Sequence, residues 1–199
     1  MKKWVCWLLC GILLAGMVGC EKKTEPRVVE QAVYRYTLAQ LKTYATAIVV
    51  GKVEKAETVS YAVPGEYQGA TQAPVQKAHV LTLKVEEDLK GTLQKGDRIP
   101  IAQEGDNETI VCTNVRDSGG YLEKGDRVLL FLAYNAEETE RFQETNPGKL
   151  LPYTIISEYQ GKLLFRGNSD TLTWKNPKND WARDCKTLDD VRALLEAVG

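Results

Sequence analysis

Few side chains in this sequence are suited to catalysis or to metal binding. The 199 residues include a single histidine, His79, and five cysteines. Hydrolases that use a serine or cysteine nucleophile pair it with a histidine base. The sequence has no Gly-x-Ser-x-Gly motif, and His79 stands at the entrance to an alternating strand pattern. We therefore expect His79 to be a surface or edge residue rather than a catalytic base.

The acidic residues do not form a convincing reactive site either. Glu104, Asp106 and Glu108 lack the spacing of a calcium loop, which favours a solvated acidic turn. Paired carboxylates of the kind that glycosidases use occur at residues 86–88 and 189–190, but the first run alternates across a strand and the second stands in the first turn of a helix. We expect no metal, no cofactor and no catalysis, with an envelope enzyme of unknown type as the alternative.

Three of the five cysteines belong to the first twenty residues. Two lysines precede an apolar run over residues 4–18, which is too short to span a bilayer comfortably, and Gly19 and Cys20 end it. This pattern resembles the lipobox of bacterial lipoproteins, in which a small residue precedes the cysteine that receives diacylglycerol. The resemblance implies a signal peptide over 1–19, lipidation of Cys20, and a lipid-anchored protein on the extracytoplasmic face of a cell membrane. An ordinary signal peptide with an incidental cysteine is the alternative.

Cys112 and Cys185 are the cysteines that remain once the leader is removed and Cys20 is lipidated. Two cysteines outside the cytoplasm can form a disulfide. Closing a loop of roughly 73 residues would stabilise the fold by about 4 kcal/mol in the chain-entropy model. The alternative is two buried thiols.

The mature chain is long enough for one domain with a buried core. Without Lys2 and Lys3 it has 24 basic and 27 acidic residues, a net charge of about −3. Because nothing indicates a basic face, we do not expect a nucleic acid partner. We divide the chain into a lipidated tether, a β domain and a C-terminal helix, at residues 20–35, 36–186 and 187–199.

Two long segments near the start of the domain are typical of strands. Residues 46–54 are rich in β-branched side chains, and Gly51 indicates a bulge or bend that lets a sheet coil. Residues 80–89 alternate between apolar and polar types. Between them, residues 57–77 contain several prolines and glycines, which predicts a long loop or a loose hairpin, where binding residues often lie.

A short motif occurs twice in the middle of the chain. Leu93–Ile99 and Leu122–Val128 each carry Lys-Gly-Asp ahead of an apolar strand, at residues 99–102 and 128–133. We interpret this as one turn used twice rather than as a repeat protein.

The remaining pattern supplies shorter elements. Thr37 and Thr187 are candidate N-caps of a short first helix and of the final helix. The other expected elements are a strand within 108–115, a polar stretch at 134–149, a hairpin joining 153–159 to 162–166 across Gln160 and Gly161, and a weak strand at 171–174.

Together these elements predict a mostly β domain, a small closed or partly open barrel of the oligonucleotide/oligosaccharide-binding (OB) kind. Residues 47–53, 83–91 and 125–132, in that order, resemble the netrin-like barrel of tissue inhibitors of metalloproteases and a group of uncharacterised Gram-positive lipoproteins. Those inhibitors chelate zinc through an N-terminal cysteine, a role that a lipidated Cys20 could not fill. A protease-inhibitor module acting through residues 57–77 is therefore only an alternative.

Four aromatic residues are the candidate binding groups. Trp174 and Trp181 flank a Pro- and Asn-containing stretch, and Tyr61 and Tyr67 lie in the early irregular segment. Exposed aromatics on such a barrel could form a platform for a glycan or a peptide; alternatively, the tryptophans seat the C-terminal helix. We expect non-catalytic binding of an envelope protein or another envelope component.

Overall fold

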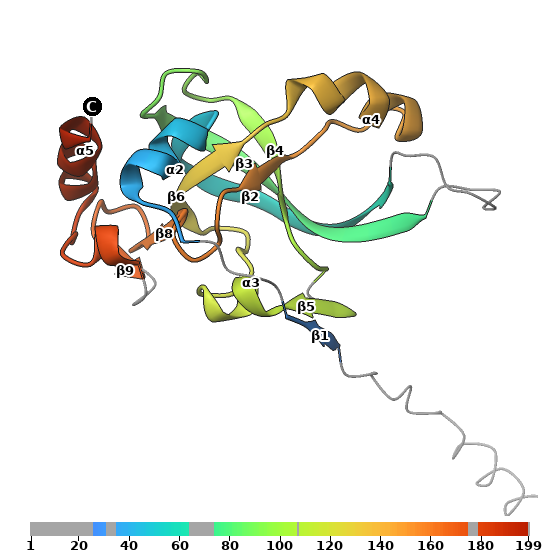
Figure 1. Ribbon diagram of the computed structural model, residues 1–199, viewed down its shortest axis with the longest axis horizontal. Coiled ribbons are helices and arrows are strands. Elements are labelled where there is room, and N and C mark those ends of the chain that lie inside the picture. Colours follow the sequence, from blue (N-terminus) through green and yellow to red (C-terminus); the bar gives the residue numbers. More distant parts are fainter. Residues whose placement is uncertain (1–25, 31–34, 64–73, 107, 175–178, 199) are drawn as a thin grey trace, which may run out of the picture.

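The computed structural model describes residues 26–30, 35–63, 74–106, 108–174 and 179–198 (Figure 1). The fold is mostly β. The strands are β1 (Arg27–Val29), β2 (Ala47–Ala62), β3 (Val75–Asp88), β4 (Arg98–Gln103), β5 (Ile110–Cys112), β6 (Arg127–Ala133), β7 (Tyr153–Ile155), β8 (Lys162–Phe165) and β9 (Leu172–Trp174). The α-helices are α2 (Leu38–Tyr44), α3 (Thr113–Asp117), α4 (Thr139–Thr145) and α5 (Leu188–Ala197), with 3-10 turns at Ala136–Glu138 and Asp180–Ala182. None of the helices in the described ranges is long and apolar enough to cross a membrane.

Seven strands form one sheet whose pairings return to their starting point. β2 pairs with β3, β3 with β4, β4 with β7, β7 with β6, and β6 with β2. The β4–β7 pair is parallel and the others are antiparallel. β8 and β9 extend the sheet beyond β6, and β1 pairs separately with β5.

The central strands are buried on both faces, which explains their unbroken apolar sequences. Ala47, Val49 and Val53 of β2 belong to one apolar cluster with residues of β3, β4 and β6. The intervening Ile48 and Val50 belong to a second cluster, which contains residues of α2 and α5. Helices α2 and α5 therefore cover one face of the sheet, as the left side of Figure 1 shows.

Both predicted helix caps are confirmed. Thr37 and Thr187 each form a capping box at the start of α2 and α5, respectively. In α5, Leu188, Val191 and Leu195 are buried against the sheet, whereas Leu194 is 37% exposed.

The repeated Lys-Gly-Asp motif forms the same turn twice. In each turn the Asp side chain accepts a hydrogen bond from the backbone N–H three residues earlier: Asp97 from Gln94 at 2.9 Å and Asp126 from Glu123 at 2.8 Å. Gly96 and Gly125 have φ of 98° and 101°, a conformation that favours glycine. Their N–H groups donate to the carbonyls of Val85 in β3 and Val53 in β2, respectively. The two turns therefore attach to two adjacent strands in the same way.

Gly51 lies at an irregularity in β2, as predicted, because the pairing register with β3 shifts between Val50 and Gly51. A Cβ atom at this position would lie 2.7 Å from the carbonyl oxygen of Lys84 and 2.9 Å from the Leu83 side chain. Glycine is thus required here by the close approach of β3.

The predictions for three connecting segments are incomplete or partly wrong. Residues 57–62 and 75–77 follow the loose-hairpin alternative rather than the long loop, because β2 and β3 continue through them as a paired arm from Val49 and Asp88 to Ala62 and Val75. The polar stretch 134–149 contains α4, whose Phe142 is buried. Of the strand expected within 108–115, three residues form β5, and residues 113–115 begin α3.

The predicted hairpin of 153–159 with 162–166 is also wrong. β7 and β8 both pair with the same edge of β6. Phe131 bridges them, since its N–H donates to Gly161 and its carbonyl accepts from Ile156, both at 2.9 Å. Residues 156–161 are therefore a tight excursion within one interrupted strand, with Ser157 at φ 53°.

A buried ion pair holds this excursion in place. Lys162 is completely buried, and its Nζ lies 2.8 Å from Oε2 of Glu158, which is also buried. The same ammonium donates to the carbonyl of Gly120 at 2.7 Å. Gln103 donates to both oxygens of Glu158 at 3.2 Å and accepts from the N–H of Leu122 at 2.8 Å. The network connects β4, β8 and the second Lys-Gly-Asp turn.

Candidate ligand-binding pocket

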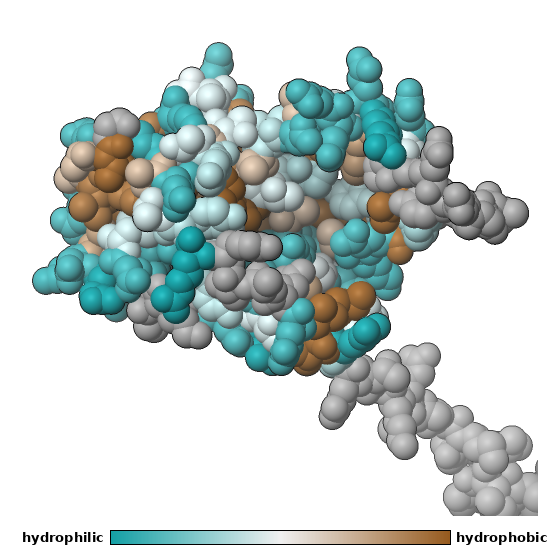
Figure 2. All heavy atoms as spheres, viewed as in Figure 1, coloured by the Kyte–Doolittle hydropathy of each residue, from teal (hydrophilic) through white to brown (hydrophobic). Residues whose placement is uncertain are grey.

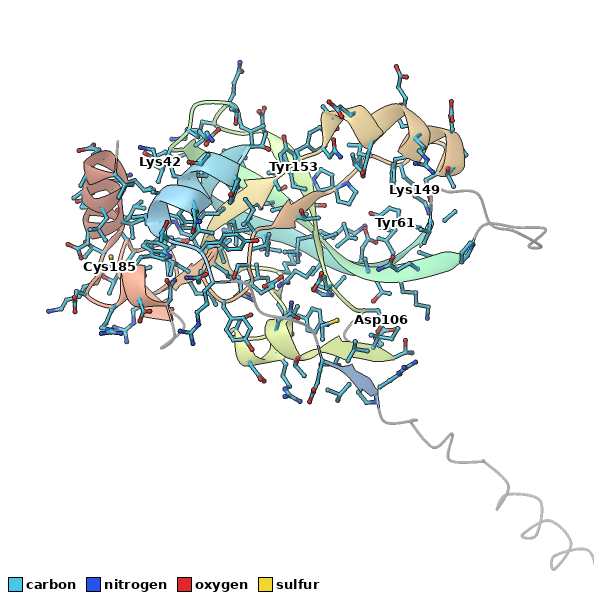
Figure 3. The ribbon with its side chains drawn as sticks, viewed as in Figure 1. Lys42, Tyr61, Asp106, Lys149, Tyr153 and Cys185 are labelled. Atoms are coloured by element: carbon cyan, nitrogen blue, oxygen red, sulfur yellow. The ribbon has the colours of Figure 1, made fainter. Side chains whose placement is uncertain are left out.

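Of the four candidate aromatic side chains, the structure describes those of Tyr61 and Trp181, and these two do not lie together as a platform. Tyr61 is half-buried at the far end of the β2–β3 arm, where its ring lies 5.4 Å from that of Phe142 in α4 and 5.2 Å from the ammonium of Lys149. Figure 3 shows Tyr61 and Lys149 on the opposite side of the molecule from Cys185, which precedes α5. Tyr61 therefore serves to attach α4 to the arm.

Trp181 lies at the helical face of the sheet. Its ring meets that of Phe131 edge-on at 5.6 Å, and its indole N–H donates to the carbonyl of Gln160 at 3.2 Å. This position matches the alternative that Trp181 seats the C-terminal segment on the sheet. Cys20, Tyr67 and the side chain of Trp174 lie outside the described residues.

Cys112 and Cys185 are buried thiols in the structure and are not joined as a disulfide. Cys185 belongs to the apolar cluster beneath α5, whereas Cys112 ends β5. Burial raises the pKa of the Cys112 thiol, and the nearby carboxylates of Glu104 and Glu158 raise it further. A thiol with a raised pKa is a poor nucleophile at neutral pH.

The expectation that His79 is a surface or edge residue is wrong, because it is buried within β3. Its Nε2 lies 2.9 Å from the carbonyl oxygen of Leu122, and its ring meets that of Tyr121 edge-on. His79 is not at a sheet edge, because β3 is paired at this point with both β2 and β4. Its contacts are those of a packed structural residue.

Asp106 is also buried and does not form a solvated turn. Its carboxylate accepts hydrogen bonds from the backbone N–H groups of Glu108, Thr109 and Ile110 and from the Thr109 hydroxyl (Figure 3). Burial acts to raise the pKa of Asp106, but these hydrogen bonds outweigh it and hold the pKa well below its usual range. In the described part of the chain, no group of three or more histidine, cysteine or acidic side chains is placed to hold a metal ion.

A pocket of about 750 Å³ opens on the helix-covered side of the sheet. Its floor comes from β2 and β3, and its walls come from β6, the first residues of α5 and the turn that contains Lys95. Pockets of this size hold small ligands or short pieces of polymer. Its charged lining residues are Lys52, Glu54, Lys84, Glu86, Glu87, Lys95, Arg127, Asp170 and Arg192.

Basic residues lie side by side across four adjacent strands at this site. In the pairing register, Arg98 of β4 is opposite Lys84, Lys84 is opposite Lys52, and Lys52 is opposite Arg127 of β6. Directly opposed residues of an antiparallel pair project on the same face, and like charges at such positions destabilise the sheet. In the row of Arg98, Lys84, Lys52 and Arg127, the opposed pair Lys52–Lys84 is thus an arrangement that stability alone does not favour, because only the two arginines have ion-pair partners among the described residues.

The acidic residues of the pocket are all engaged by arginines. Arg127 contacts Glu86 at 2.6 Å and Asp170 at 2.9 Å. These hydrogen bonds overcome the effect of burial and raise the pKa of Arg127. In the same way Arg192 of α5 pairs with Glu87, and Arg98 binds Glu54 through both Nε and Nη2, at 2.7 and 3.3 Å.

The lysines of the pocket differ from the arginines in this respect. Among the described residues, Lys52, Lys84 and Lys95 form no ion pair; Lys52 donates to the side-chain oxygen of Asn168 at 3.3 Å. Lys84 lies close enough to Glu54 to contribute, after Arg98, to lowering the pKa of that carboxyl. The pocket therefore presents three ammonium groups whose charge no paired carboxylate balances.

Sequence reasoning did not single out these lysines. They come from two strands and a turn. Lys52 and Lys84 are ordinary polar positions in their strands, and Lys95 was noted only as part of the Lys-Gly-Asp turn. Only the pairing register, which periodicity does not determine, brings Lys52 and Lys84 together.

In comparisons with known proteins, no family model, no curated protein and no solved structure matches the chain. The resemblance to the netrin-like barrel and to the lipoproteins therefore stays a prediction.

Proposed function

We propose that this chain is a lipid-anchored protein of the extracytoplasmic face of a cell membrane, and that its domain binds an envelope component without catalysis. The apolar run and Gly19–Cys20 of the leader support the anchor. The observation that carries the binding role is the pocket, where unpaired lysines are held on a paired sheet surface.

We infer further that the five cyclically paired strands form a closed barrel of the OB kind. The five pairings among β2, β3, β4, β7 and β6 support this inference, as does the bend at Gly51. In such barrels the ligand lies on an outer sheet face that is bordered by loops. The pocket has a comparable position, since β2 and β3 form its floor and a turn and α5 border it.

The reactive groups in the described part of the chain do not assemble into a catalytic site. His79, Cys112 and Asp106 are each buried and engaged in structural contacts. None of them lines the pocket. A binding role is thus better supported than an enzymatic one.

Two measurements test the two parts of the proposal. For the anchor, the wild-type protein is expected in the membrane fraction and a Cys20→Ala variant outside it; equal membrane retention of both would contradict lipidation at Cys20. For binding, sedimentation with isolated envelopes should retain the wild-type domain.

The binding assay needs a variant of equal charge as its control. The triple variant Lys52→Gln, Lys84→Gln, Lys95→Gln removes the unpaired lysines of the pocket. The matched variant Lys55→Gln, Lys77→Gln, Lys124→Gln removes three exposed lysines elsewhere; Lys124 occupies in the second Lys-Gly-Asp turn the place that Lys95 has in the first. We expect loss of envelope binding in the first triple variant alone. Equal loss in both would mean that the pocket is not the binding site.

A further inference from the structure

The chemistry of the pocket indicates which ligand it suits. We propose that it binds a ligand carrying two or more phosphate groups, of the kind found along a phosphodiester polymer. This inference rests on the proposed binding function of the same pocket and adds the ligand class to it.

The sign of the ligand's charge follows from the ion pairs. The four carboxylates of the pocket are paired with Arg98, Arg127 and Arg192, and the three lysines have no ion-pair partner among the residues that the structure describes. An anion placed among the lysines gains attraction without having to displace a carboxylate. It also relieves the repulsion between Lys52 and Lys84, which are directly opposed in the sheet.

The type of anion follows from which cations are available. The planar fork of arginine binds two oxygens of a carboxylate or of a phosphate at once. Here that fork is occupied: Arg98 binds Glu54 in this two-oxygen manner, and Arg127 contacts both Glu86 and Asp170. Lysine acts as a point charge with three rotatable donors, and such ammonium groups are common phosphate binders. The available cations are therefore lysines, which suit a phosphate ligand, and a comparison with poly-glutamate tests that choice against carboxylate.

The number of phosphates follows from the size and arrangement of the site. Lys52 and Lys84 come from neighbouring strands, which lie about 4.8 Å apart, and Lys95 comes from a turn at the pocket's edge. A single orthophosphate ion would fill only a small part of a 750 Å³ pocket. A ligand with linked phosphates can contact the three ammonium groups together.

The test uses defined probes and the full chain purified in detergent. Isothermal titration is carried out with tripolyphosphate, orthophosphate and poly-glutamate. We expect tripolyphosphate to bind at least tenfold more tightly than orthophosphate, and poly-glutamate to bind more weakly per charge. The K52Q/K84Q/K95Q variant should lose at least tenfold in tripolyphosphate affinity, and the equally charged K55Q/K77Q/K124Q variant should not.

A folding readout accompanies the titration. Because the first variant removes opposed like charges, its unfolding temperature should equal or exceed that of the wild type, so that loss of binding is not loss of the fold. Equal affinity for tripolyphosphate and poly-glutamate, or equal loss in the two triple variants, would overturn the phosphate assignment. If envelopes still bind through the three lysines while no phosphate probe does, this inference fails and the proposed binding function stands.

Discussion

Replacing Glu158 by glutamine removes the carboxylate that faces the buried ammonium of Lys162. The pair is completely enclosed, with side-chain exposures of 5% and 0%, and the Nζ to Oε2 distance is 2.8 Å. Removing one partner of a buried pair costs about 3 to 5 kcal/mol, because the other charge stays buried without its counter-charge. Glutamine still offers an oxygen, and Gly120 still accepts from Lys162, so we expect a loss near the lower end, about 3 kcal/mol.

The chain contains a control that separates burial from distance. Lys55 and Glu57 form a shorter contact of 2.6 Å, but their side chains are 61% and 46% exposed. Exposed pairs contribute about 0 to 1 kcal/mol, so Lys55→Gln should hardly change the free energy of unfolding. A double variant, Glu158→Leu with Lys162→Met, removes both charges and should recover part of the loss caused by Glu158→Gln.

Urea unfolding followed by tryptophan fluorescence measures these differences. Trp181 reports on the core because its ring packs against Phe131. We expect a lower midpoint for Glu158→Gln, with an unchanged slope against urea. If Glu158→Gln were no more destabilising than Lys55→Gln, the reasoning that burial gives this pair its structural importance would be refuted.

Three further outcomes follow from individual contacts. Hydrogen bonds hold the pKa of Asp106 below its usual range, so its charge stabilises the fold above the unfolded pKa of about 3.9. Asp106→Asn should therefore lower the free energy of unfolding by about 1.5 to 3 kcal/mol at pH 7. Urea titrations should show this difference shrinking as the pH falls below about 4. Gly51→Ala would place a Cβ 2.7 Å from the carbonyl of Lys84 and should lower stability by about 1 to 3 kcal/mol, and an unchanged midpoint of thermal unfolding would contradict the close approach of β3. Cys112 and Cys185 should react with a thiol reagent in urea without prior reduction and only slowly in the folded protein, and a requirement for reductant in urea would show that they are paired.

Local sequence patterns predicted the elements whose signals are short-range. The capping threonines Thr37 and Thr187 predicted where α2 and α5 begin, and the repeated Lys-Gly-Asp motif predicted two equivalent turns. The β-branched residues of β2 and the glycine at position 51 likewise predicted a strand with an irregularity at Gly51. In each case the information lies within a few neighbouring residues.

The errors arose where long-range contacts decide the structure. Residues 57–62 look like a loop because they contain few large apolar side chains, yet they pair with β3, and Asn146 supports their end by hydrogen-bonding both the N–H and the carbonyl of Ala62 at 2.8 Å. The turn at Gln160–Gly161 joins two strands that both pair with β6 rather than with each other. The local sequence does not indicate which strand is the partner.

The candidate site could not be predicted for the same reason. The aromatic residues stood out by type, but Tyr61 and Trp181 are used for internal packing. Figure 2 shows that the visible face is mostly polar, with apolar residues gathered over α5 and around β1 and β5; Leu194, Val28 and Ile110 are the exposed members of these elements. Lysines are common on polar surfaces, so Lys52 and Lys84 could not be predicted as binding residues before the pairing register was known to place them opposite one another.

The most direct test of the binding role is photo-crosslinking in intact cells with a photoreactive amino acid at position 95 or at position 124. These positions are equivalent within two copies of the same turn, but only the first lines the pocket. We expect an envelope adduct from position 95 that is lost when Lys52 and Lys84 are replaced by glutamine, and little or none from position 124. Equal adducts from both positions would contradict it.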